Sequence, residues 1–463
     1  MAPDAALRAI AAFGGLVLVD LDETLYLSNS TEDFIDVVRP ALPAAILLRL
    51  LDGVQPWRLT GGETTRDAWR VRLILLLFPW AGMLWRKHVG RLAAQFANRP
   101  LLTQLQNRQP APIVATAGFL PIVLPLLAAL GVPETRVIGS RANTFADRRS
   151  GKLHRVREAL GESALRGAMV VTDSLQDLPL LQLCATPVYT TWPDARYRRA
   201  LSGVYLPGQY ISLVKRPGER YFLRAILQED FALWVICSIA LADAPWPHVI
   251  GLLLLLVSFW TIYERGYVDN DLMGAKHETN PRLSAAFFEA PVATPFWQPW
   301  IWAAAFGAAG AWVLRAGSPT WLDAAKWAGV LIATYAWFAV YNRTDKAART
   351  WMFSVLQFAR AAAFTVLVPI EPIGAMALGA HVLARWTPYY LYRLRGSEWP
   401  GGIAVGPIRT LFFAVLAVLL AIATGWHSLI NWTAYALFAW SLYRAGDGIK
   451  QLFSSKAFRR ARN

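Results

Sequence analysis

The residues best suited to chemistry in the first half of the chain are acids that follow short apolar runs. Asp20 ends the run "LVLVD", and Asp22 comes two residues later, so both carboxylates can project the same way as the run ends. Asp173 ends a similar run, "AMVVTD", with Asp177 four residues further on. A set of carboxylate oxygens suits Mg²⁺, which keeps waters and binds phosphate. The pattern therefore favours magnesium-assisted phosphoryl chemistry.

Two more polar residues belong to the same pattern. Thr116 ends the apolar run in "PIVATAG", and Lys152 begins a predicted helix in "SGKLHRVREALG". Phosphoryl transfer needs charge neutralised on the phosphate oxygens, and a metal ion with a lysine supplies that. Read alone, "DLDET" also fits a strand followed by an acidic turn. That alternative weakens because each later polar group also follows a strand or begins a helix.

An open α/β sheet can position these groups. The β-rich apolar runs predict buried parallel strands, and such sheets carry their sites at the carboxyl ends of the strands. The fold expected for residues 1–206 is therefore a Rossmann-like parallel sheet. Residues from Thr24 to about Pro110 form too long an insertion for a loop, and they predict a helical cap over about residues 28–110.

At these residues the chain resembles the haloacid dehalogenase-like (HAD) phosphatase superfamily, whose four motifs occur in order across residues 16–181. The resemblance implies that Asp20 is the nucleophile and that Asp22 protonates the leaving alcohol. It also implies that Thr116 holds a phosphoryl oxygen and that Lys152 neutralises the aspartyl-phosphate. The Mg²⁺ ligands that it implies are Asp20, Asp173 and Asp177.

Inside the predicted cap, the stretch "LILLLFPWAGMLW" is too short to span a bilayer. Basic residues flank it on both sides: Arg70, Arg72, Arg86 and Lys87. Two interpretations stay open. The stretch is either the buried core of the cap, or it lies in the membrane surface with its basic flanks on the headgroups.

The second half of the chain is more apolar. Of 463 residues 55% are hydrophobic and 21 are Trp, which is too apolar for one ordinary soluble domain. After a predicted interfacial linker at 207–229, residues 230–463 predict an all-α polytopic membrane domain. Its expected apolar segments are 230–246, 248–264, 296–314, 320–341, 351–369, 373–392, 407–425 and 427–443.

The formal charge of +15 is unevenly placed. Counting the tail, fifteen Lys and Arg of the polar joints fall on one side of the predicted segments, and Arg315 alone falls on the other. This asymmetry predicts a multi-pass protein of the cytoplasmic membrane, with the N-terminal domain and the C-terminus cytoplasmic. It argues against a nucleic-acid partner. Two cysteines suit a reducing cytoplasm, and the first 25 residues carry no signal-peptide pattern.

Acids and bases gather in the joint that is expected behind the second segment, "YERGYVDNDLMGAKHETNPRLS". Carboxylates such as Asp271 and Glu278 can hold Mg²⁺ on a diphosphate, while Lys276 meets its remaining oxygens. A second joint, "YNRTDKAART", occupies the equivalent place after the fourth segment. For both joints the plain alternative is a solvated loop.

Here residues 230–450 resemble the UbiA superfamily of intramembrane prenyltransferases, whose domains usually have nine helices. Its first motif, N-D-x-x-D-x-x-x-D, is matched by Asn270, Asp271 and Glu278, with Gly274 at one acidic position. The second motif is reduced to Asp345 with Arg349, and Tyr341 and Lys346 match other residues of the family. The resemblance implies eight or nine helices and a Mg²⁺ site at Asp271 and Glu278.

Arg360 and Arg385 fall inside the fifth and sixth segments. Ionisable groups within a membrane are expensive, so these side chains are expected to face the interior and contact substrate phosphates. The alternative is a structural hydrogen bond between helices.

The pairing of the two domains resembles that of decaprenyl-phosphoryl-ribose synthesis. It implies transfer of phosphoribose from phosphoribosyl diphosphate to polyprenyl phosphate, followed by removal of the 5-phosphate. One alternative is a prenyltransferase that uses a prenyl diphosphate and a cytoplasmic acceptor. Another is a membrane half that has lost catalysis and anchors the phosphatase through a bound lipid.

Overall fold

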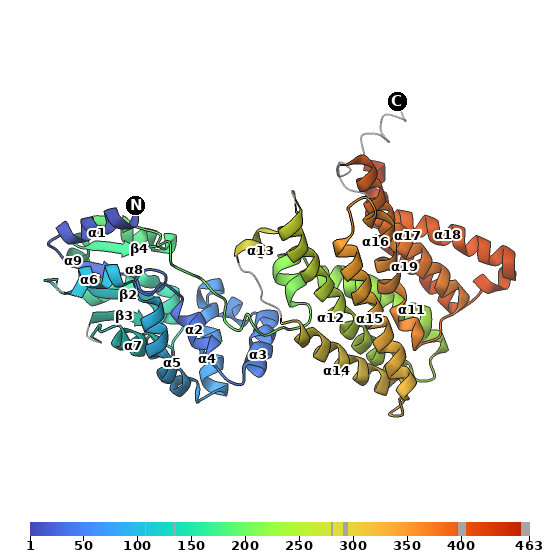
Figure 1. The fold of residues 1–463 in the computed structure, drawn as a ribbon, viewed down its shortest axis with the longest axis horizontal. Helices are drawn as coiled ribbons and strands as arrows, with labels where there is room; N and C mark the ends of the chain where they lie inside the picture. Colours follow the sequence, from blue (N-terminus) through green and yellow to red (C-terminus); the bar gives the residue numbers. More distant parts are fainter. Residues whose placement is uncertain (107, 134–135, 279–280, 290–294, 397–403, 455–463) are drawn as a thin grey trace. The chain divides into compact units, whose positions relative to one another are not determined.

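The structure, a computed structural model, describes residues 1–106, 108–133, 136–278, 281–289, 295–396 and 404–454. The chain divides into two compact units, Met1–Val204 (unit 1) and Tyr205–Asn463 (unit 2), and each is described by itself (Figure 1). The basic tail that contributed to the predicted orientation lies outside the described residues.

Unit 1 is built on a parallel sheet of five strands in the order β3-β2-β1-β4-β5. The strands are β1 (Val17–Val19), β2 (Ile113–Phe119), β3 (Val137–Ser140), β4 (Met169–Thr172) and β5 (Thr186–Tyr189). All residues of β1 and β4 are buried, as their unbroken apolar runs predict. The prediction of a parallel α/β sheet is therefore confirmed.

The strand order places a topological switch point between β1 and β4. The chain runs from β1 outward to β2 and β3, then returns to the other side of β1 for β4 and β5. At such a point the connections leave in opposite directions and open a crevice at the carboxyl ends of the strands. Asp20 follows β1 and Asp173 follows β4. Their strands are paired in register, Val19 against Val171.

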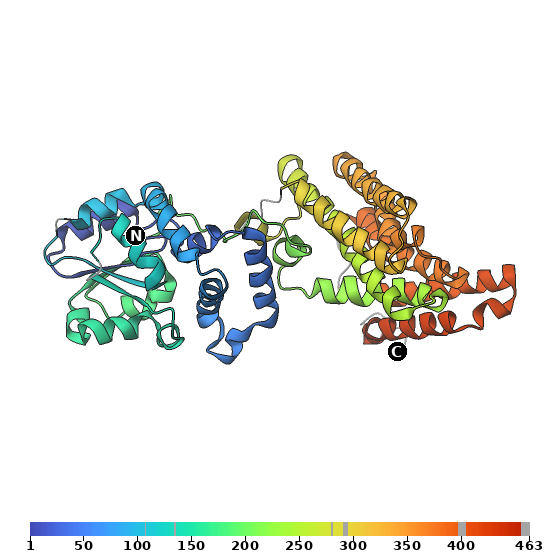
Figure 2. The ribbon, with the colours of Figure 1, turned by 90° about the horizontal axis from the view of Figure 1, so that it is seen from below.

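Helices on the sheet and helices of the inserted segment make up the rest of unit 1 (Figures 1 and 2). Those following or preceding strands are α1 (Pro3–Ala12), α7 (Leu120–Ala129), α8 (Ala146–Leu160), α9 (Glu162–Arg166), η4 (Leu175–Asp177) and α10 (Leu178–Leu181). The insertion between β1 and β2 contains α2 (Ser30–Asp36), α3 (Ala41–Val54), η1 (Pro56–Leu59), η2 (Gly62–Thr65), α4 (Arg66–Leu77), α5 (Ala81–Phe96) and α6 (Arg99–Gln106). We call this inserted segment the cap. Trp85 anchors α5 by donating a hydrogen bond from its indole to the carbonyl of Ile122 on α7, at 2.9 Å.

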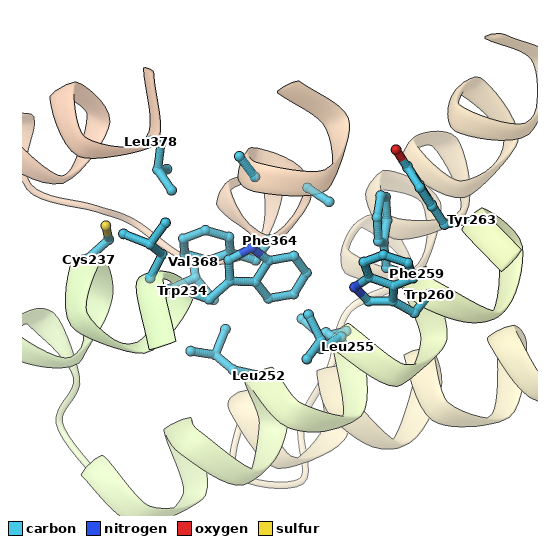
Figure 3. Packing of buried hydrophobic residues seen from close by; sticks show 14 of the residues in the cluster. Trp234, Cys237, Leu252, Leu255, Phe259, Trp260, Tyr263, Phe364, Val368 and Leu378 are labelled. Atoms are coloured by element: carbon cyan, nitrogen blue, oxygen red, sulfur yellow. The ribbon is translucent and has the colours of Figure 1, made fainter. Parts of the chain in front are cut away.

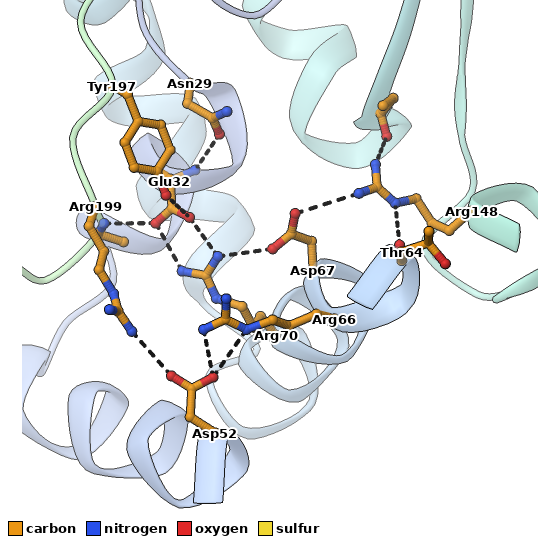
Figure 4. Close-up of polar contacts among 12 residues, drawn as sticks. Asn29, Glu32, Asp52, Thr64, Arg66, Asp67, Arg70, Arg148, Tyr197 and Arg199 are labelled. Atoms are coloured by element: carbon orange, nitrogen blue, oxygen red, sulfur yellow. Dashed lines mark hydrogen bonds and ion pairs between the residues drawn. The ribbon is translucent and has the colours of Figure 1, made fainter. Parts of the chain in front are cut away.

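Ion pairs hold the cap helices together (Figure 4). Glu32 on α2 accepts two hydrogen bonds from Arg70 on α4, at 2.5 and 2.9 Å, and both side chains are buried. Asp52 on α3 pairs with Arg66 at 2.8 Å and with Arg199 at 3.1 Å. Because a buried pair compensates the desolvation of each charge only when both partners are present, the Glu32–Arg70 pair constrains how α2 packs against α4.

Unit 2 is helical in its described residues. Its first elements are the π-helices η5 (Ile211–Lys215) and η6 (Phe222–Phe231), then α11 (Ala232–Ser238), η7 (Ile239–Leu241), α12 (Pro245–His277) and α13 (Ala285–Glu289). The others are α14 (Trp297–Leu314), α15 (Trp321–Arg343), α16 (Arg349–Ala362), η8 (Ala363–Val366), α17 (Pro372–Arg395), α18 (Val405–Thr424), η9 (Trp426–Leu429) and α19 (Trp432–Ser454). The all-α class that was predicted for this half is confirmed.

The predicted number of membrane spans is not confirmed. Within the described residues of unit 2, only α12 and α18 have both the length and the apolar composition of a candidate membrane span. The other helices fall short for physical reasons: α16 has 14 residues, and α17 carries Arg385, Arg393 and Arg395. Two such helices are consistent with a membrane protein, whereas the multi-pass topology and its orientation stay predictions.

The acidic stretch expected to be a joint after residue 264 is helical instead. Helix α12 continues through it to His277. The polar residues favour this continuation because they find partners along the helix and beside it: Arg265 pairs with Asp269 one turn away at 2.5 Å, and Lys215 pairs with Asp271 at 2.6 Å.

The core of unit 2 is rich in aromatic side chains (Figure 3). Trp234 on α11 stacks on Phe364 with ring centroids 4.9 Å apart, and Leu252 and Phe259 of α12 belong to the same buried cluster. Helices α12 and α14 approach closely at Gly251 and Gly310. A Cβ atom on Gly310 would lie 3.0 Å from the carbonyl oxygen of Gly251, so only glycine allows this spacing.

Candidate functional site

The first candidate site lies at the switch point of unit 1. Asp20 is held just beyond β1, where its N–H donates to the carbonyl of Val171 at 2.9 Å and so extends the sheet by one residue. Its Oδ1 accepts from the N–H of Leu21 at 2.8 Å, and its Oδ2 accepts from the hydroxyl of Thr172 at 3.2 Å. The carboxylate is therefore oriented by backbone and side chain together.

Lys152 is the cation of this site. Helix α8 is interrupted at Gly151, whose φ of 79° only glycine adopts without strain, and Lys152 begins the part after the kink. Its ammonium group lies 2.9 Å from Oδ1 of Asp20 and 2.6 Å from Oδ2 of Asp177. The predicted nucleophile and the predicted lysine are thus in contact.

The other predicted acids converge on the same edge of the sheet. Asp173 accepts a hydrogen bond from the hydroxyl of Thr24 at 2.9 Å, which ties the end of β4 to the turn after β1. Asp22 accepts from the N–H of Ser30 at 2.6 Å, at the first turn of α2. Asp177 accepts from Thr172 at 2.7 Å as well as from Lys152.

Burial shifts the acidities of the two central carboxyl groups. It raises the pKa of Asp20 to about 6, with Lys152 opposing the rise and Asp177 adding to it. Burial also raises the pKa of Asp22 to about 7, although the Ser30 N–H opposes the rise. Near neutral pH, Asp20 is therefore mostly an anion, and a large fraction of Asp22 keeps its proton. A nucleophile and a general acid need these two states.

Thr116 is buried in β2 rather than at its end, because the strand continues to Phe119 with a register irregularity between Ala115 and Phe119. Its hydroxyl accepts from the N–H of Gly118 at 2.9 Å. A Cβ atom on Gly118 would lie 3.2 Å from that hydroxyl and 3.5 Å from the hydroxyl of Ser30. Cγ2 of Val123 would be closer still, at 2.7 Å, so Gly118 lets these three side chains pack against the strand.

The second candidate site is a cavity of about 440 Å³ in unit 2. Eight Lys and Arg side chains line it against two acids, Asp271 and Glu278. The basic residues are Lys215, Arg216, Arg282, Lys346, Arg349, Arg360, Arg385 and Arg393. Such an excess of positive charge suits a ligand with several phosphate oxygens.

Both acids of this cavity have cationic partners. Asp271 lies on α12, 2.6 Å from Lys215 and 2.9 Å from the hydroxyl of Tyr210. Glu278 follows α12 and pairs with Lys346 at 3.0 Å and with Arg349 at 2.9 Å. These ion pairs therefore join the first UbiA-like motif, through Glu278, to the second UbiA-like motif, through Lys346 and Arg349.

Of the other predicted residues of this half, Asn270, Tyr341, Arg360 and Arg385 also line the cavity. Arg360 is buried and pairs with Asp230 at 2.6 Å. Arg385 pairs with Glu229. Each of these arginines therefore borders the cavity while it is held by an acid of η6.

Two predicted substrate residues do not line the cavity. Lys276 is exposed near the end of α12, and Asp345 is exposed with its carboxylate on the N–H of Ala347 at 2.8 Å. Glu264, another acid of the same sequence stretch, also lies outside the lining. Glu264 accepts from the N–H groups of Gly208 and Ile211, at 2.9 and 2.8 Å.

Comparison with protein families bears on the unit that carries the first of these sites. Residues 17–182 match the model of the haloacid dehalogenase-like hydrolases. Unit 1 therefore contains a HAD hydrolase domain, and the match begins at β1 and ends nine residues after Asp173. Searches of curated proteins and of solved structures returned no match for the chain.

Magnesium, which HAD hydrolases generally use, fits the residues of the HAD domain as an ion held jointly by carboxylates, water and substrate phosphate. In the part of the chain that the structure describes, no three or more His, Cys, Asp or Glu side chains are arranged to hold a metal ion by themselves. Mg²⁺, however, is usually held by one or two carboxylates together with waters and substrate phosphate. Asp20 and Asp173 offer two carboxylates, and burial raises the pKa of Asp173 as it does that of Asp20. A cation would stabilise both anions.

Sequence reasoning missed several residues around these sites. In the HAD domain, Thr24 and Thr172 orient the acids, and the available signal was their closeness in sequence to Asp22 and Asp173. In unit 2, Lys215 and Arg216 line the cavity, although residues 207–229 were predicted to be an interfacial linker. The basic run "VKRPGER" was the signal there, but only packing shows which surface it faces.

Proposed function

We propose that the chain is a bifunctional membrane enzyme. Unit 2 transfers phosphoribose from phosphoribosyl diphosphate to a polyprenyl phosphate, and the HAD domain removes the 5-phosphate of the product. The observation that carries the proposal is the cavity of unit 2, where eight basic side chains face two acids that are already paired.

The charge of the cavity supports two phosphate-bearing substrates. Eight cations line the cavity against two acids, although Arg216, Arg360 and Arg385 also pair with acids outside the lining. A donor with a diphosphate and a 5-phosphate, together with an acceptor phosphate, would bring several anions to this lining. A prenyltransferase has one diphosphate to neutralise and therefore needs fewer cations.

In the proposed transfer, a phosphate oxygen of the lipid attacks C1 of the ribose. The bond from C1 to the diphosphate oxygen breaks, and the diphosphate leaves with the bonding electrons. Lys346 and Arg349 would stabilise the charge that develops on the leaving group. Asp271 and Glu278 are the carboxylates that would hold Mg²⁺ beside the diphosphate, where the ion would neutralise further charge.

In the proposed hydrolysis, Asp20 attacks the phosphorus of the 5-phosphate, and Asp22 gives its proton to the ribose oxygen as the P–O bond breaks. Water then attacks the aspartyl-phosphate, and Asp22 accepts a proton from that water. Lys152 neutralises charge at Asp20 through both steps. The match to the HAD hydrolases and the pKa values of about 6 and 7 support these roles.

One observation favours a second candidate, a prenyltransferase. The cavity lining includes the aromatic side chains of Tyr267, Phe353 and Tyr389, which could pack against a prenyl chain. The resemblance of Asn270 and Asp271 to the UbiA motif supports either transfer.

The deciding experiment compares donors. Purified full-length protein with Mg²⁺ and polyprenyl phosphate would receive phosphoribosyl diphosphate, and a parallel sample would receive prenyl diphosphate with aromatic acceptors. Mass spectrometry of the lipids should detect polyprenyl-phosphoryl-ribose in the first sample and its 5-phosphorylated form when Asp20 is replaced by Asn. Consumption of prenyl diphosphate alone would establish the second candidate. Lipid binding without consumption of either donor would leave unit 2 as an anchor.

A further inference from the structure

The cap exposes an unusual number of large apolar side chains. In the described part of unit 1, fourteen large hydrophobic side chains are exposed, and nine of them lie between Leu42 and Met83. Helix α3 carries four at intervals of four residues, which places them along one side of the helix: Leu42, Ile46, Leu50 and Val54. Its buried residues include Ala44 and Ala45. Besides these two alanines the helix buries Leu51, while its four other apolar side chains named above face outward, which is unusual for a surface helix.

The corner between α4 and α5 exposes a second group of apolar side chains. The two helices meet at an angle of 113°, with Phe78 and Ala81 buried inside the corner. Outside it, Leu76 is 75% exposed and Met83 is 62% exposed, and Leu77 and Trp80 are exposed as well. One side of this stretch is therefore core of the cap, as the first predicted alternative has it, and the other side faces outward.

The corner adjoins the beginning of α3. The indole N–H of Trp80 donates to the carbonyl of Arg39, two residues before α3 begins, at 2.6 Å. The polar edge of Trp80 is therefore satisfied within the protein while its ring is partly exposed. We call the surface formed by the exposed side chains of α3 and the α4–α5 corner the cap face.

The charge around the cap face is strongly positive. Residues 39–99 contain ten Lys and Arg against three Asp and Glu. The three acids are engaged within the cap. Asp52 and Asp67 pair with arginines (Figure 4), and Glu63 accepts a hydrogen bond from the indole of Trp57. Exposed basic side chains remain at Arg39, Arg58, Arg86, Lys87 and Arg91.

From this arrangement we infer that the cap face docks on an anionic lipid surface, with its apolar side chains in the interfacial region and its basic side chains on the headgroups. Apolar residues flanked by Lys and Arg are the chemistry of membrane-surface helices, and each basic residue adds attraction to anionic lipid. The same chain carries two helices with the length and apolar composition of membrane spans. These helices would keep the cap close to a lipid surface. A soluble partner would have to compete with that surface.

The cap face lies in the interface and does not cross the bilayer. Helix α4 carries Arg66 and Arg70, whose ion pairs with Asp52 and Glu32 hold the cap together. Moving α4 into hydrocarbon would place these charges in the membrane or break the pairs. The outer side of α3 and the α4–α5 corner can enter the membrane interface without placing these charges in the membrane or breaking their ion pairs.

Docking would serve the proposed hydrolysis, and this part of the inference rests on the proposed function. A 5-phosphate on a polyprenyl lipid sits at the membrane surface, so a phosphatase whose cap binds that surface meets its substrate by diffusion along the membrane. Hydrolysis of a water-soluble ester would gain nothing from docking.

Fluorescence quenching tests the docking itself. Full-length protein without Cys184 and Cys237 would carry a single labelled cysteine at Leu50, Leu77 or Met83, or at exposed Ser163 on α9 as the control, in nanodiscs that contain anionic lipid. We expect quenchers on the lipid acyl chains to quench the three cap labels several-fold more than the Ser163 label, and iodide in water to show the opposite order. Cap labels quenched by iodide alone would overturn the inference. Labels shielded from both quenchers would overturn it in favour of a protein partner.

Measurements of phosphatase activity test the consequence of docking for hydrolysis. In Leu50→Glu and Leu77→Glu, activity on a lipid-linked sugar phosphate in the same nanodiscs should fall about tenfold, because each change replaces an apolar contact with a charge. Activity on soluble p-nitrophenyl phosphate should be unchanged, and Ser163→Glu should leave both activities at the parent level. An equal loss on both substrates would overturn the link to hydrolysis. A parent enzyme inactive on the lipid would instead contradict the proposed function and leave the quenching result valid.

Discussion

The ammonium group of Lys152 lies 2.9 Å from Oδ1 of Asp20, so the end of β1 and the kinked helix α8 meet in one ion pair. The two residues are far apart in sequence, and Gly151 provides the backbone conformation that lets Lys152 begin the second part of its helix there. This contact stabilises the anionic form of a carboxyl group whose pKa burial would otherwise raise further.

The first prediction follows from that contact. Asp20→Asn should reduce hydrolysis of p-nitrophenyl phosphate to background, because an amide is a poor nucleophile. Lys152→Met should lower kcat about a hundredfold or more, since it removes one group that stabilises the phosphoryl charge. His154→Gln, on the same helix, serves as the control and should keep parent activity. Parent-level hydrolysis by the Asp20→Asn protein would disprove the assignment of the nucleophile.

The second prediction is a bell-shaped pH profile for hydrolysis of an alkyl phosphate, whose leaving group must be protonated. Activity should rise as Asp20 loses its proton near its pKa of about 6 and fall as Asp22 loses its proton near about 7. Because Mg²⁺ favours the Asp20 anion, raising the Mg²⁺ concentration should move the acidic limb to lower pH. Steady-state rates between pH 4 and 9 at several Mg²⁺ concentrations measure both effects.

Asp22→Asn provides the matching test of the general acid. Without a proton to donate, the variant should lose most activity on alkyl phosphates and keep more on p-nitrophenyl phosphate, whose leaving group needs no protonation. Equal losses on both substrates would argue against a general acid at Asp22.

The third prediction separates the cavity of unit 2 from its surroundings. Asp271→Asn should reduce lipid transfer about a hundredfold, because it removes a carboxylate from the cavity, where Lys215 pairs with it at 2.6 Å. Asp345→Asn makes the same chemical change at an exposed residue outside the lining and should leave transfer near the parent rate. Both variants should hydrolyse p-nitrophenyl phosphate normally. Equal sensitivity of the two positions would contradict this choice of site.

The fourth prediction concerns the buried pair of Arg360 and Asp230, which lie 2.6 Å apart. Asp230→Leu should destabilise unit 2 by about 3–5 kcal/mol, because it leaves a buried guanidinium without its carboxylate. The double variant Asp230→Leu/Arg360→Met should recover most of that loss, since both charges are gone. Thermal unfolding in detergent measures the recovery. Lipid transfer should remain impaired in the double variant because Arg360 borders the cavity.

The fifth prediction tests the orientation that the basic residues imply. With Cys184 and Cys237 replaced, a cysteine at Thr344 should react with a membrane-impermeant reagent only from the cytoplasmic side, and one at Ser318 only from the opposite side. The two positions lie at opposite ends of α15. Labelling of both from one side would mean that α15 does not cross the membrane.

The sequence by itself determined the HAD domain and the helical class of the second half. Strands that are buried on both faces must be apolar throughout, and acids directly after them must meet at one edge of a parallel sheet. Asp20, Asp22 and Asp173 could therefore be identified from local patterns alone. The long apolar runs of unit 2 predicted helices because about twenty consecutive apolar residues have the length of a helix that spans a bilayer.

Only the tertiary structure decided which distant residues meet. Local patterns cannot show that Lys215 reaches Asp271, that Arg349 joins the two reduced motifs through Glu278, or that Asp345 stays outside the cavity. The same holds for the end of α12, because its polar residues favour a helix only through partners contributed by other segments. The sequence alone does not show whether an apolar side chain packs inward or faces outward. The exposed stripe of α3 therefore became visible only when Ala44 and Ala45 were seen to take the buried side.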